Sequence, residues 1–353
     1  MAEEPELDLL LAGTVFFDIV FTGLPHEPRP GQEVWTEGMG SCPGGIANLA
    51  VAASRLGLRT ALASGFGDDV YAEWLWGVLR DQERVDLRYS QRHHGEHTPV
   101  TVALSYEDDR AFVTHGHAWP TSAGEMLAEL PRTRAVLVDV GDEAVRAETW
   151  WRHAAAAGAL VFATAGWDPD QQWDGRILDE IRGCHAFIPN AVEAMGYTRT
   201  SSVDEALVAL SERVPLAIVT RGRDGVSGID TTTGERADVP AVPVPVIDTT
   251  GAGDVFAAAV VLGTLRGWPL KKRLAFAALC SALAVTQVGG SLAAPGWGDV
   301  ADWWREHKDP ADGDAAAREV ADRYGFLTDC LRGVETPKVR RAEATIAKFS
   351  DAG

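Results

Sequence analysis

The hydrophobic positions beyond about residue 134 alternate between short apolar runs and longer segments with helical spacing. Short continuous apolar runs are typical of buried strands, and recurrence every three or four residues is typical of helices. Strands that alternate with helices predict βαβ units, a parallel sheet and an α/β fold. The expected strands are residues 7–15, 60–66, 135–140, 160–163, 186–188 and 216–220, and the expected helices are residues 46–56, 70–79, 144–157, 177–182, 203–213, 255–265 and 270–288.

Two further segments do not follow this alternation. Residues 23–45 are rich in Pro and Gly and predict a loop or a small strand excursion, whereas residues 98–106 and 111–113 flank an acidic turn and predict a hairpin. A second hairpin is expected from residues 225–230 and 235–246. Because the first two pieces are inserted into a βαβ frame, we expect residues of about 20–42 and 98–117 to form a small β lid over a site.

The chain has 353 residues, of which 46% are hydrophobic, so it can bury a large core. Its composition changes after about residue 300, where the sequence becomes charged and prone to helix formation. We therefore expect one α/β domain over residues 1–300 and a helical C-terminal extension over residues 301–353.

The formal net charge of −19 argues against nucleic acid and against an anionic membrane as partners, because both would need a basic surface. The four cysteines are far apart and show no metal-ligand spacing, which favours a reducing compartment. The first residues are acidic, unlike a signal peptide, and no apolar run is long enough for a membrane span. A cytoplasmic location is expected.

The strongest chemical signal is the string Val-Ile-Asp-Thr-Thr-Gly-Ala-Gly-Asp-Val-Phe over residues 246–256. Its glycines precede a helix, so the backbone amides of Gly251, Ala252 and Gly253 can face an anion that the helix dipole also favours. Asp254 would then lie beside a bound phosphate, where a carboxylate can accept the proton of an attacking hydroxyl. The structural alternative is an ordinary acidic residue in the first turn of a well-capped helix.

The second signal is Gly44-Gly45-Ile46-Ala47-Asn48, which is followed by an alanine-rich helix. Paired glycines let a small ligand approach the backbone closely, and the Asn48 amide can both donate and accept hydrogen bonds to a polyol. A glycine turn that leads into a buried helix is the alternative interpretation.

In this order and at this separation, the two strings resemble the two signatures of the PfkB-type, or ribokinase-like, carbohydrate kinases. The resemblance covers about residues 7–300. It implies a three-layer α/β sandwich with a mostly parallel central sheet and a small β lid. It also implies phosphoryl transfer from ATP with Mg²⁺, often helped by a monovalent cation such as K⁺.

The resemblance assigns roles to further residues on the acceptor and metal side. Asp18, in Gly13-Thr14-Val15-Phe16-Phe17-Asp18, matches a carboxylate that binds substrate hydroxyls together with Gly44, Gly45 and Asn48. Asn190-Ala191-Val192-Glu193 resembles a segment that organises Mg²⁺ and phosphate through water, although Asn followed three residues later by Glu is also a helix capping box. Asp248 is the candidate ligand for a monovalent cation.

Nucleotide binding is implied for Thr220, Gly222 and Gly225, which match the pattern Thr-x-Gly-x-x-Gly; a hairpin turn is the alternative. Two positions depart from the family pattern. Only two residues separate Gly45 from Asn48, where the family usually has three, and this leaves open which glycine contacts substrate. Phe16 stands where some ribose-specific members carry a polar residue, which argues against ribose itself.

The sequence therefore predicts an ATP-dependent carbohydrate kinase with Asp254 as base and an unphosphorylated sugar as the first-ranked substrate. A nucleoside kinase of the same fold and a catalytically weak sugar- or nucleotide-binding regulator remain alternatives. A nicotinamide oxidoreductase does not fit, because the first strand lacks the GxGxxG turn. A homodimer through the lid, involving Val34, Trp35 and residues 98–106, is a further expectation.

Overall fold

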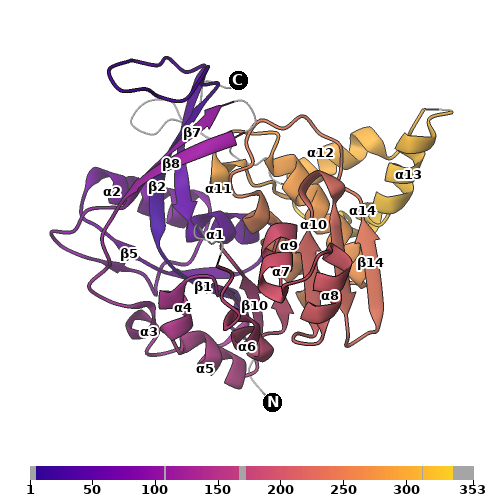
Figure 1. Cartoon of the computed structure of the whole chain (residues 1–353), viewed down its shortest axis with the longest axis horizontal. Coiled ribbons are helices and arrows are strands. Elements are labelled where there is room, and N and C mark those ends of the chain that lie inside the picture. The colour runs from indigo at the N-terminus through magenta and orange to yellow at the C-terminus, as the bar shows by residue number, and fades with distance from the viewer. Residues whose placement is uncertain (1–4, 107–108, 167–171, 312, 337–353) are drawn as a thin grey trace.

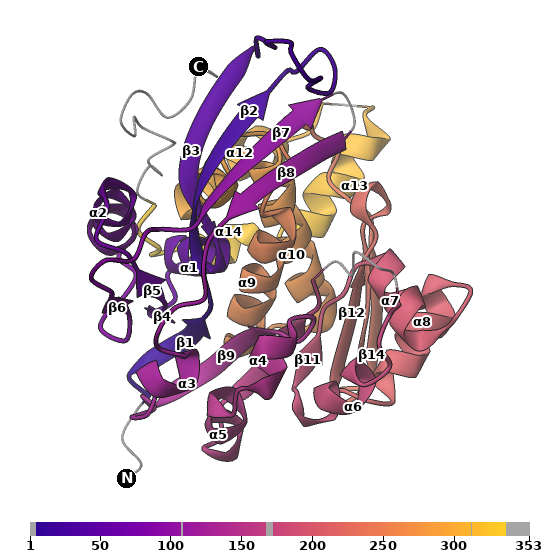
Figure 2. The same ribbon diagram turned by 60° about the vertical axis from the view of Figure 1, so that its left-hand side comes forward.

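The computed structural model describes residues 5–106, 109–166, 172–311 and 313–336, and its largest element there is an eight-stranded sheet (Figures 1 and 2). The strand order is β14–β13–β12–β11–β10–β9–β1–β4, in which β12 to β4 are parallel and β13 and β14 form an antiparallel edge hairpin. The strands are β1 (Leu7–Ala12), β4 (Thr60–Ala63), β9 (Thr133–Asp139), β10 (Leu160–Thr164), β11 (Ala186–Phe187), β12 (Leu216–Thr220), β13 (Val226–Asp230) and β14 (Glu235–Val239).

This sheet is buried on both faces, because its central strands carry runs of consecutive apolar residues, such as Leu9–Ala12 of β1 and Ala135–Val138 of β9. Leu9 and Leu11 of β1 pack with Leu137 of β9 into one core, whereas Leu10 packs with Val136 into a second core on the opposite face. The first face is covered by α1 (Ile46–Arg55), α2 (Val70–Gly77), α9 (Ala252–Leu265), α10 (Leu270–Ala284) and α12 (Trp297–His307), and the second by α5 (Trp150–Ala156), α6 (Ile177–Glu180), α7 (Ala191–Thr198) and α8 (Val203–Ser211). The three-layer α/β sandwich is confirmed.

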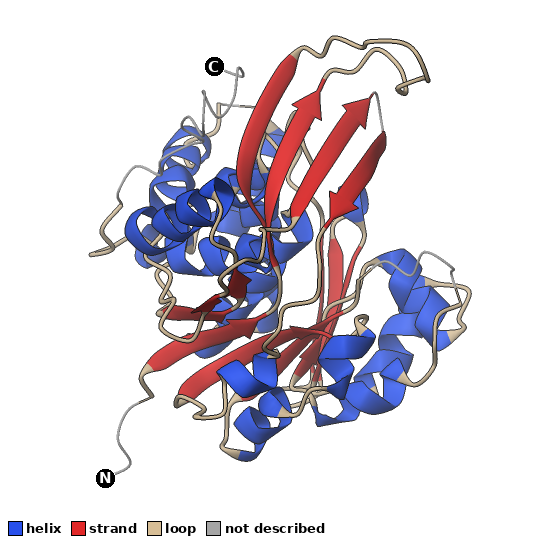
Figure 3. Cartoon of the chain, turned by 90° about the vertical axis from the view of Figure 1, so that its left-hand side faces the viewer, coloured by secondary structure: helices blue, strands red, loops and turns tan. Residues whose placement is uncertain are grey.

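A four-stranded sheet, which we call the lid sheet, rises from one end of this sandwich (Figure 3). Its order is β3–β2–β7–β8, and only the central pair β2–β7 is parallel. The expected 98–117 hairpin is confirmed by the pairing of β7 with β8, and its turn residues 107–108 lie outside the described part of the chain. The strands are β2 (Val15–Thr22), β3 (Gly38–Gly45), β7 (Val100–Tyr106) and β8 (Asp109–His115).

The lid sheet has two different faces. The register Asp18–Thr101–Thr114 puts these three side chains on one face, which we call the inner face. On the same face Val20 and Ala103 pack against Val288 of the sandwich. The opposite, outer face carries Phe17, whose ring packs on Tyr71 and Trp74 of α2. Both faces of β2 therefore contact the sandwich, the inner face at Val288 and the outer face at α2.

Several expected elements are divided in the structure. The expected strand 7–15 ends at Ala12, and the chain turns before Val15 begins β2; the expected strand 60–66 is split into β4 and β5 (Gly65–Phe66), which pairs with β6 (Gln91–Arg92). The expected helix 144–157 is wrong, because it is two helices, α4 (Glu143–Ala147) and α5. Glu148 between them is extended and accepts a hydrogen bond from the Gly124 amide. Within residues 23–45, expected to form a loop or a small strand excursion, residues 38–45 form a full strand that pairs with β2.

The C-terminal helices pack onto the first core. Helix α12 spans the division expected near residue 300, and its Trp297, Val300 and Trp304 are buried among core side chains. Tyr324 of α13 (Ala315–Tyr324) is buried in the same core. The remaining described helices are α3 (Ala123–Met126), α11 (Gly290–Ala293) and α14 (Leu327–Cys330). A π-helical turn lies at Val78–Gln82, and 3₁₀ turns lie at Ile181–Gly183 and Gly222–Asp224. Among the described residues, no helix combines the length and apolarity that a bilayer crossing needs.

Candidate active site

The carboxyl ends of the parallel strands meet at one edge of the main sheet, as they must in such a topology. β9 ends at Asp139 and β12 at Thr220, and Thr220 forms an isolated bridge with Asn190, which follows β11. The N-terminus of α9 reaches the same edge, because Ala252 and Gly253 line one cavity together with Thr220. This edge therefore collects most of the residues singled out in the sequence.

The start of α9 consists of the small residues Gly251, Ala252 and Gly253, which leave the backbone amides uncovered; we call this segment the cradle. Gly251 is its N-cap in the left-handed conformation (φ 74°), which glycine adopts without steric cost. Gly253 is exposed, and a Cβ built on it would meet no atom within 4 Å. The first amides of a helix lack partners within that helix and favour anions. The Ala252 amide, however, donates to Thr249 O at 3.3 Å, so the three expected donors are not equivalent.

Asp254 follows this cradle and faces Asn48 across the gap between α9 and α1. Burial raises the pKa of Asp254 to about 7, the Asn48 side-chain hydrogen bond opposes that rise, and the charge of Asp139 adds to it. The Asn48 Oδ1 atom is buried and has no hydrogen-bond partner in the described structure. The structure thus pairs the two residues that the two sequence strings put forward separately.

Asp139 is a residue of this site that the sequence did not reveal. Its Oδ1 atom accepts hydrogen bonds from the amides of Gly141 (2.8 Å) and Gly166 (2.9 Å). Burial raises its pKa, and these amides oppose the rise. Its charge in turn contributes to raising the pKa values of Glu193 and Asp254, so the three carboxylates form one electrostatic group.

Glu193 and Asn190 form the capping box that was the structural alternative for this pair. The Glu193 amide donates to Asn190 Oδ1 at 2.9 Å, and the Asn190 amide donates to Glu193 Oε2 at 2.8 Å. Glu193 is nevertheless buried, and burial raises its pKa to about 7. A capping role and an electrostatic role therefore coexist in one carboxylate.

Asp18 lies on the inner face of the lid sheet, above the glycine segment. A Cβ on Gly44 would be 1.9 Å from Asp18 Oδ2, so the carboxylate fills the space that any larger residue would need. Gly45 (φ 60°) makes the turn into α1, where a Cβ would meet Thr14 O at 2.4 Å. Burial raises the pKa of Asp18 to about 7, and the charge of Asp248 adds to the rise.

Asp248 is buried beside this acceptor side of the site. Its two oxygens accept hydrogen bonds from the Thr250 amide (2.9 Å) and the Gly289 amide (3.2 Å). It thereby ties the start of the 248–254 string to the loop after α10. A buried carboxylate that also raises the pKa of a second carboxylate fits a bound cation, which would offset both negative charges.

The loop expected to bind nucleotide lines a cavity of about 530 Å³. Thr220, Gly222 and Gly225 lie on one side, and Ala252 and Gly253 of the α9 cradle on another. The remaining walls are mostly apolar and come from residues 241–246 and from α9 and α10. Gly225 is fixed here by its backbone (φ 90°), because a Cβ would lie 2.1 Å from Val239 O.

These observations divide the site into three adjoining parts. An apolar cavity ends at the glycine cradle of α9, an acidic group of Asp139, Glu193 and Asp254 lies beside it, and Asp18 approaches from the lid sheet. Carboxylate oxygens with raised pKa values are suitable ligands, direct or through water, for a hard divalent cation such as Mg²⁺. The arrangement can hold an anion, a cation and a polar molecule together.

Comparison with known proteins places this arrangement in context. The model of the pfkB family of carbohydrate kinases matches residues 19–296. The ribokinase of Bacillus subtilis is 26% identical over 295 residues, covering 82% of this chain and 96% of the relative. A nucleoside kinase of Methanothermobacter thermautotrophicus is 26% identical over 298 residues, covering 83% and 94%. The solved structure of Arabidopsis thaliana ribokinase complexed with ribose and ATP is similar in fold, with a TM-score of 0.69, 22% identity and coverage of 84% and 98%.

Proposed function

The chain belongs to the pfkB family of carbohydrate kinases, and from this premise we propose that it phosphorylates a hydroxyl of a small sugar-like molecule with Asp254 as the general base. The observation that carries the proposal is the position of Asp254, which lies between an anion cradle and the polar side chain of Asn48. A carboxylate with a pKa of about 7 is half ionised near neutral pH and can take up a proton there.

The proposed transfer needs positioning and charge stabilisation more than covalent chemistry. As the acceptor oxygen bonds to the γ-phosphorus and the bond to the β–γ bridging oxygen breaks, Asp254 takes the hydroxyl proton. The amides at the start of α9, chiefly those of Gly251 and Gly253, would stabilise the charge on the transferring group. Ala252 contributes mainly to the turn, because its amide is directed to Thr249 O.

The acceptor would be oriented by Asp18 and Asn48. The Asn48 Oδ1 atom is buried without a hydrogen-bond partner among the described residues, and the buried Asp18 carboxylate has a raised pKa. Leaving a buried acceptor unpaired costs free energy, about 1–3 kcal/mol per group, which a substrate hydroxyl would recover. Gly44 supports this role by leaving room for Asp18, and Gly45 by turning the chain toward Asn48.

ATP would occupy the cavity between the Thr220–Gly225 loop and the α9 cradle. Its adenine ring would lie against the apolar walls and its phosphates at Gly253. Mg²⁺ fits the acidic group, and Glu193 and Asp139 would hold it directly or through water, with Asn190 keeping Glu193 in place. When bound, Mg²⁺ would neutralise phosphate charge. Asp248 would hold a monovalent cation such as K⁺.

The lid sheet would close the acceptor side and exclude water from the transfer. Large apolar side chains are exposed here, namely Phe112 (51% exposed) and Val113 (63%) on β8 and Trp35 (80%) in the loop between β2 and β3. Such residues favour pairing of two lid sheets in a homodimer, which sedimentation at micromolar concentration tests directly. A purely monomeric protein would remove the pairing but not the kinase proposal.

The substrate class is tested by an ADP-release panel over free sugars, sugar acids, sugar phosphates and nucleosides, with Asp254→Asn as the blank for each compound. We expect turnover with an unphosphorylated sugar. Turnover with a nucleoside alone would favour the second candidate, which the nucleoside kinase relative supports. Failure of every compound to exceed the blank would contradict the proposed function.

A further inference from the structure

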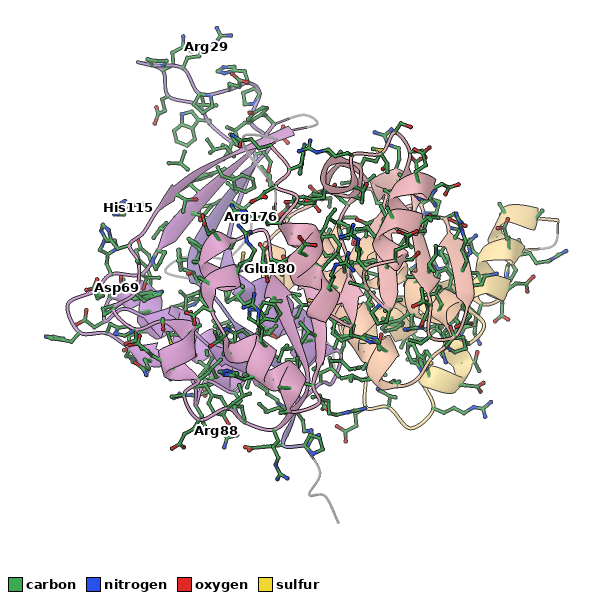
Figure 4. All side chains as sticks on the ribbon, turned by 60° about the horizontal axis from the view of Figure 1, so that its bottom comes forward. Arg29, Asp69, Arg88, His115, Arg176 and Glu180 are labelled. Carbon is green, nitrogen blue, oxygen red and sulfur yellow. The ribbon has the colours of Figure 1, made fainter. Side chains whose placement is uncertain are left out.

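Three histidines, His97, His115 and His117, come together at the open end of the β7–β8 hairpin, and we refer to them as the histidine triad. All three are exposed, and one ring nitrogen of each lies within 4.8 Å of a nitrogen of the others. The rings of His97 and His115 are stacked with centroids 5.1 Å apart, and the His117 ring meets them edge-on at 4.9 and 5.1 Å. Figure 4 shows His115 projecting outward from the ribbon, above Asp69.

The backbone explains why these residues converge. His115 pairs with Val100 in the antiparallel register, and His97 precedes Val100 by three residues. His115 and His117 are two residues apart, a spacing that keeps side chains on one side of an extended chain. The donors therefore lie on both sides of the hairpin's open end: His115 ends β8, His117 follows it by two residues, and His97 belongs to the segment that leads into β7.

The triad is separate from the proposed catalytic site. His115 and Val100 share a register row with Phe17, which lies on the outer face of the lid sheet and packs on α2. Asp18 belongs to the neighbouring row with Thr101 and Thr114, on the inner face. Because successive side chains of a strand point to opposite faces, the lid sheet stands between the triad and Asp18.

We propose that His97, His115 and His117 bind a transition-metal ion of the Zn²⁺ class, which would cross-link the two strands of the lid hairpin at its open end. Three imidazoles are the ligand set of open tetrahedral zinc sites, whereas Mg²⁺ requires oxygen ligands. Zn–N distances of about 2.0–2.1 Å require the nitrogens to approach to roughly 3.4 Å, which rotation of exposed rings permits.

Contacts around His97 prepare it as a ligand. Its Nδ1 atom lies 3.4 Å from Thr98 O, and donation to that carbonyl leaves Nε2 free to bind the ion. Thr98 is itself held by Asp69, whose carboxylate accepts from the Thr98 amide at 2.6 Å and from the Thr98 hydroxyl at 2.8 Å. Asp69 also caps α2 through the Ala72 amide at 2.8 Å. The segment that carries His97 is thus anchored to α2 before any ion binds.

The test is calorimetric titration of ZnCl₂ into the untagged, chelator-treated full chain. We expect one equivalent to bind, and the double variant His115→Ala/His117→Ala to bind at least about 100-fold more weakly, since losing even one outer-sphere partner costs roughly 10–100-fold. Two controls should bind as the wild type does: His26→Ala, exposed in the loop after β2, and His94→Ala, which pairs with Asp68 at 2.6 Å. Excess MgCl₂ should leave the binding unchanged.

Binding that survives in the double variant, equal loss in either control, or the absence of stoichiometric binding would overturn the proposal. Thermal unfolding without metal confirms that the variants fold, as expected for exposed positions. Hydrogen exchange supplies the second readout: Zn²⁺ should slow amide exchange in residues 100–102 and 113–115 of the wild type only. Unchanged exchange in the metal-bound wild type would contradict the cross-link.

Discussion

The carboxylate of Asp18 lies in the space directly above Gly44, so that a Cβ on Gly44 would be 1.9 Å from Asp18 Oδ2. The relation follows from the register of β2 with β3, which pairs Asp18 with Cys42 and Phe16 with Gly44. The sequence left open which glycine of the pair matters for substrate. The structure gives them different tasks, since Gly44 makes room for Asp18 and Gly45 makes the turn into α1.

Gly44→Ala should therefore displace the Asp18 carboxylate. We expect kcat/KM for the acceptor to fall by about 100-fold, the effect of a misplacement of roughly 1 Å, while the KM for ATP stays within about twofold. Steady-state kinetics with each substrate varied in turn measures the split. Gly77→Ala at the end of α2 is the matched control, because its Cβ would meet nothing within 4 Å. Equal losses for both substrates would contradict a role on the acceptor side.

Asp139→Asn should change the pH dependence of turnover. The negative charge of Asp139 helps to raise the pKa values of Asp254 and Glu193, so its removal lowers both. The rising limb of kcat/KM should then move to lower pH, because the base is deprotonated earlier. The Asn Oδ1 atom can still accept from the Gly141 and Gly166 amides, which preserves the turn. An unshifted limb would show that Asp139 does not face the base in solution; Asp302→Asn on α12 is the charge-matched control.

Ala278→Leu should test the cavity as the nucleotide site. Ala278 lies half-buried on α10 and lines the cavity, so three added carbons fill space that the adenine would need. We expect the KM for ATP to rise by about tenfold with the acceptor KM unchanged. Ala209→Leu, on α8 away from this cavity, should leave both constants as they are in the wild type. A rise in the acceptor KM alone would place the acceptor in the cavity instead.

The stability of the ligand-free protein should fall as pH rises through 7. Asp18, Glu193 and Asp254 have pKa values of about 7 when folded, above those of unfolded carboxyl groups, so the folded state holds more protons between about pH 4 and 7. Their contribution is fully present below the unfolded pKa and is lost as pH passes the folded pKa. Urea unfolding at pH 6 and 8 measures this loss.

Asp254→Asn isolates one group in that experiment. The variant should lose less stability than the wild type between pH 6 and 8, because the amide does not titrate. The lowered pKa of half-buried His185, which acts in the opposite direction, cancels in this comparison. A wild-type protein that gains stability relative to the variant over this range would contradict the raised pKa.

The hydrophobic pattern was sufficient to predict the layered α/β fold, because buried parallel strands and amphipathic helices have local signatures. Asp254 and the Thr220–Gly225 loop could also be found, because each belongs to a short sequence motif whose glycines lie within a few residues of it. Asp139 could not, because a single Asp at the end of an apolar run has no motif. Its importance arises only when β9 takes its place between β1 and β10.

The break between α4 and α5 shows a second limit. Residues 144–157 have continuous helix-forming character, yet Glu148 is extended and its side chain accepts a hydrogen bond from the amide of Gly124, in the first turn of α3. That break allows Trp150 and Trp151 to be buried in the second core. Such a tertiary contact overrides local helix propensity, and the local sequence does not predict it.

The most direct test of the proposed chemistry is the kcat of Asp254→Asn, measured by ADP release on the substrate that the panel identifies. Calorimetric ATP binding and the unfolding midpoint should stay near those of the wild type, because Asn preserves the shape of the side chain beside Asn48. The kcat should fall by at least about 100-fold, the usual contribution of a well-placed base. A variant that retains near wild-type kcat would show that Asp254 is not the base.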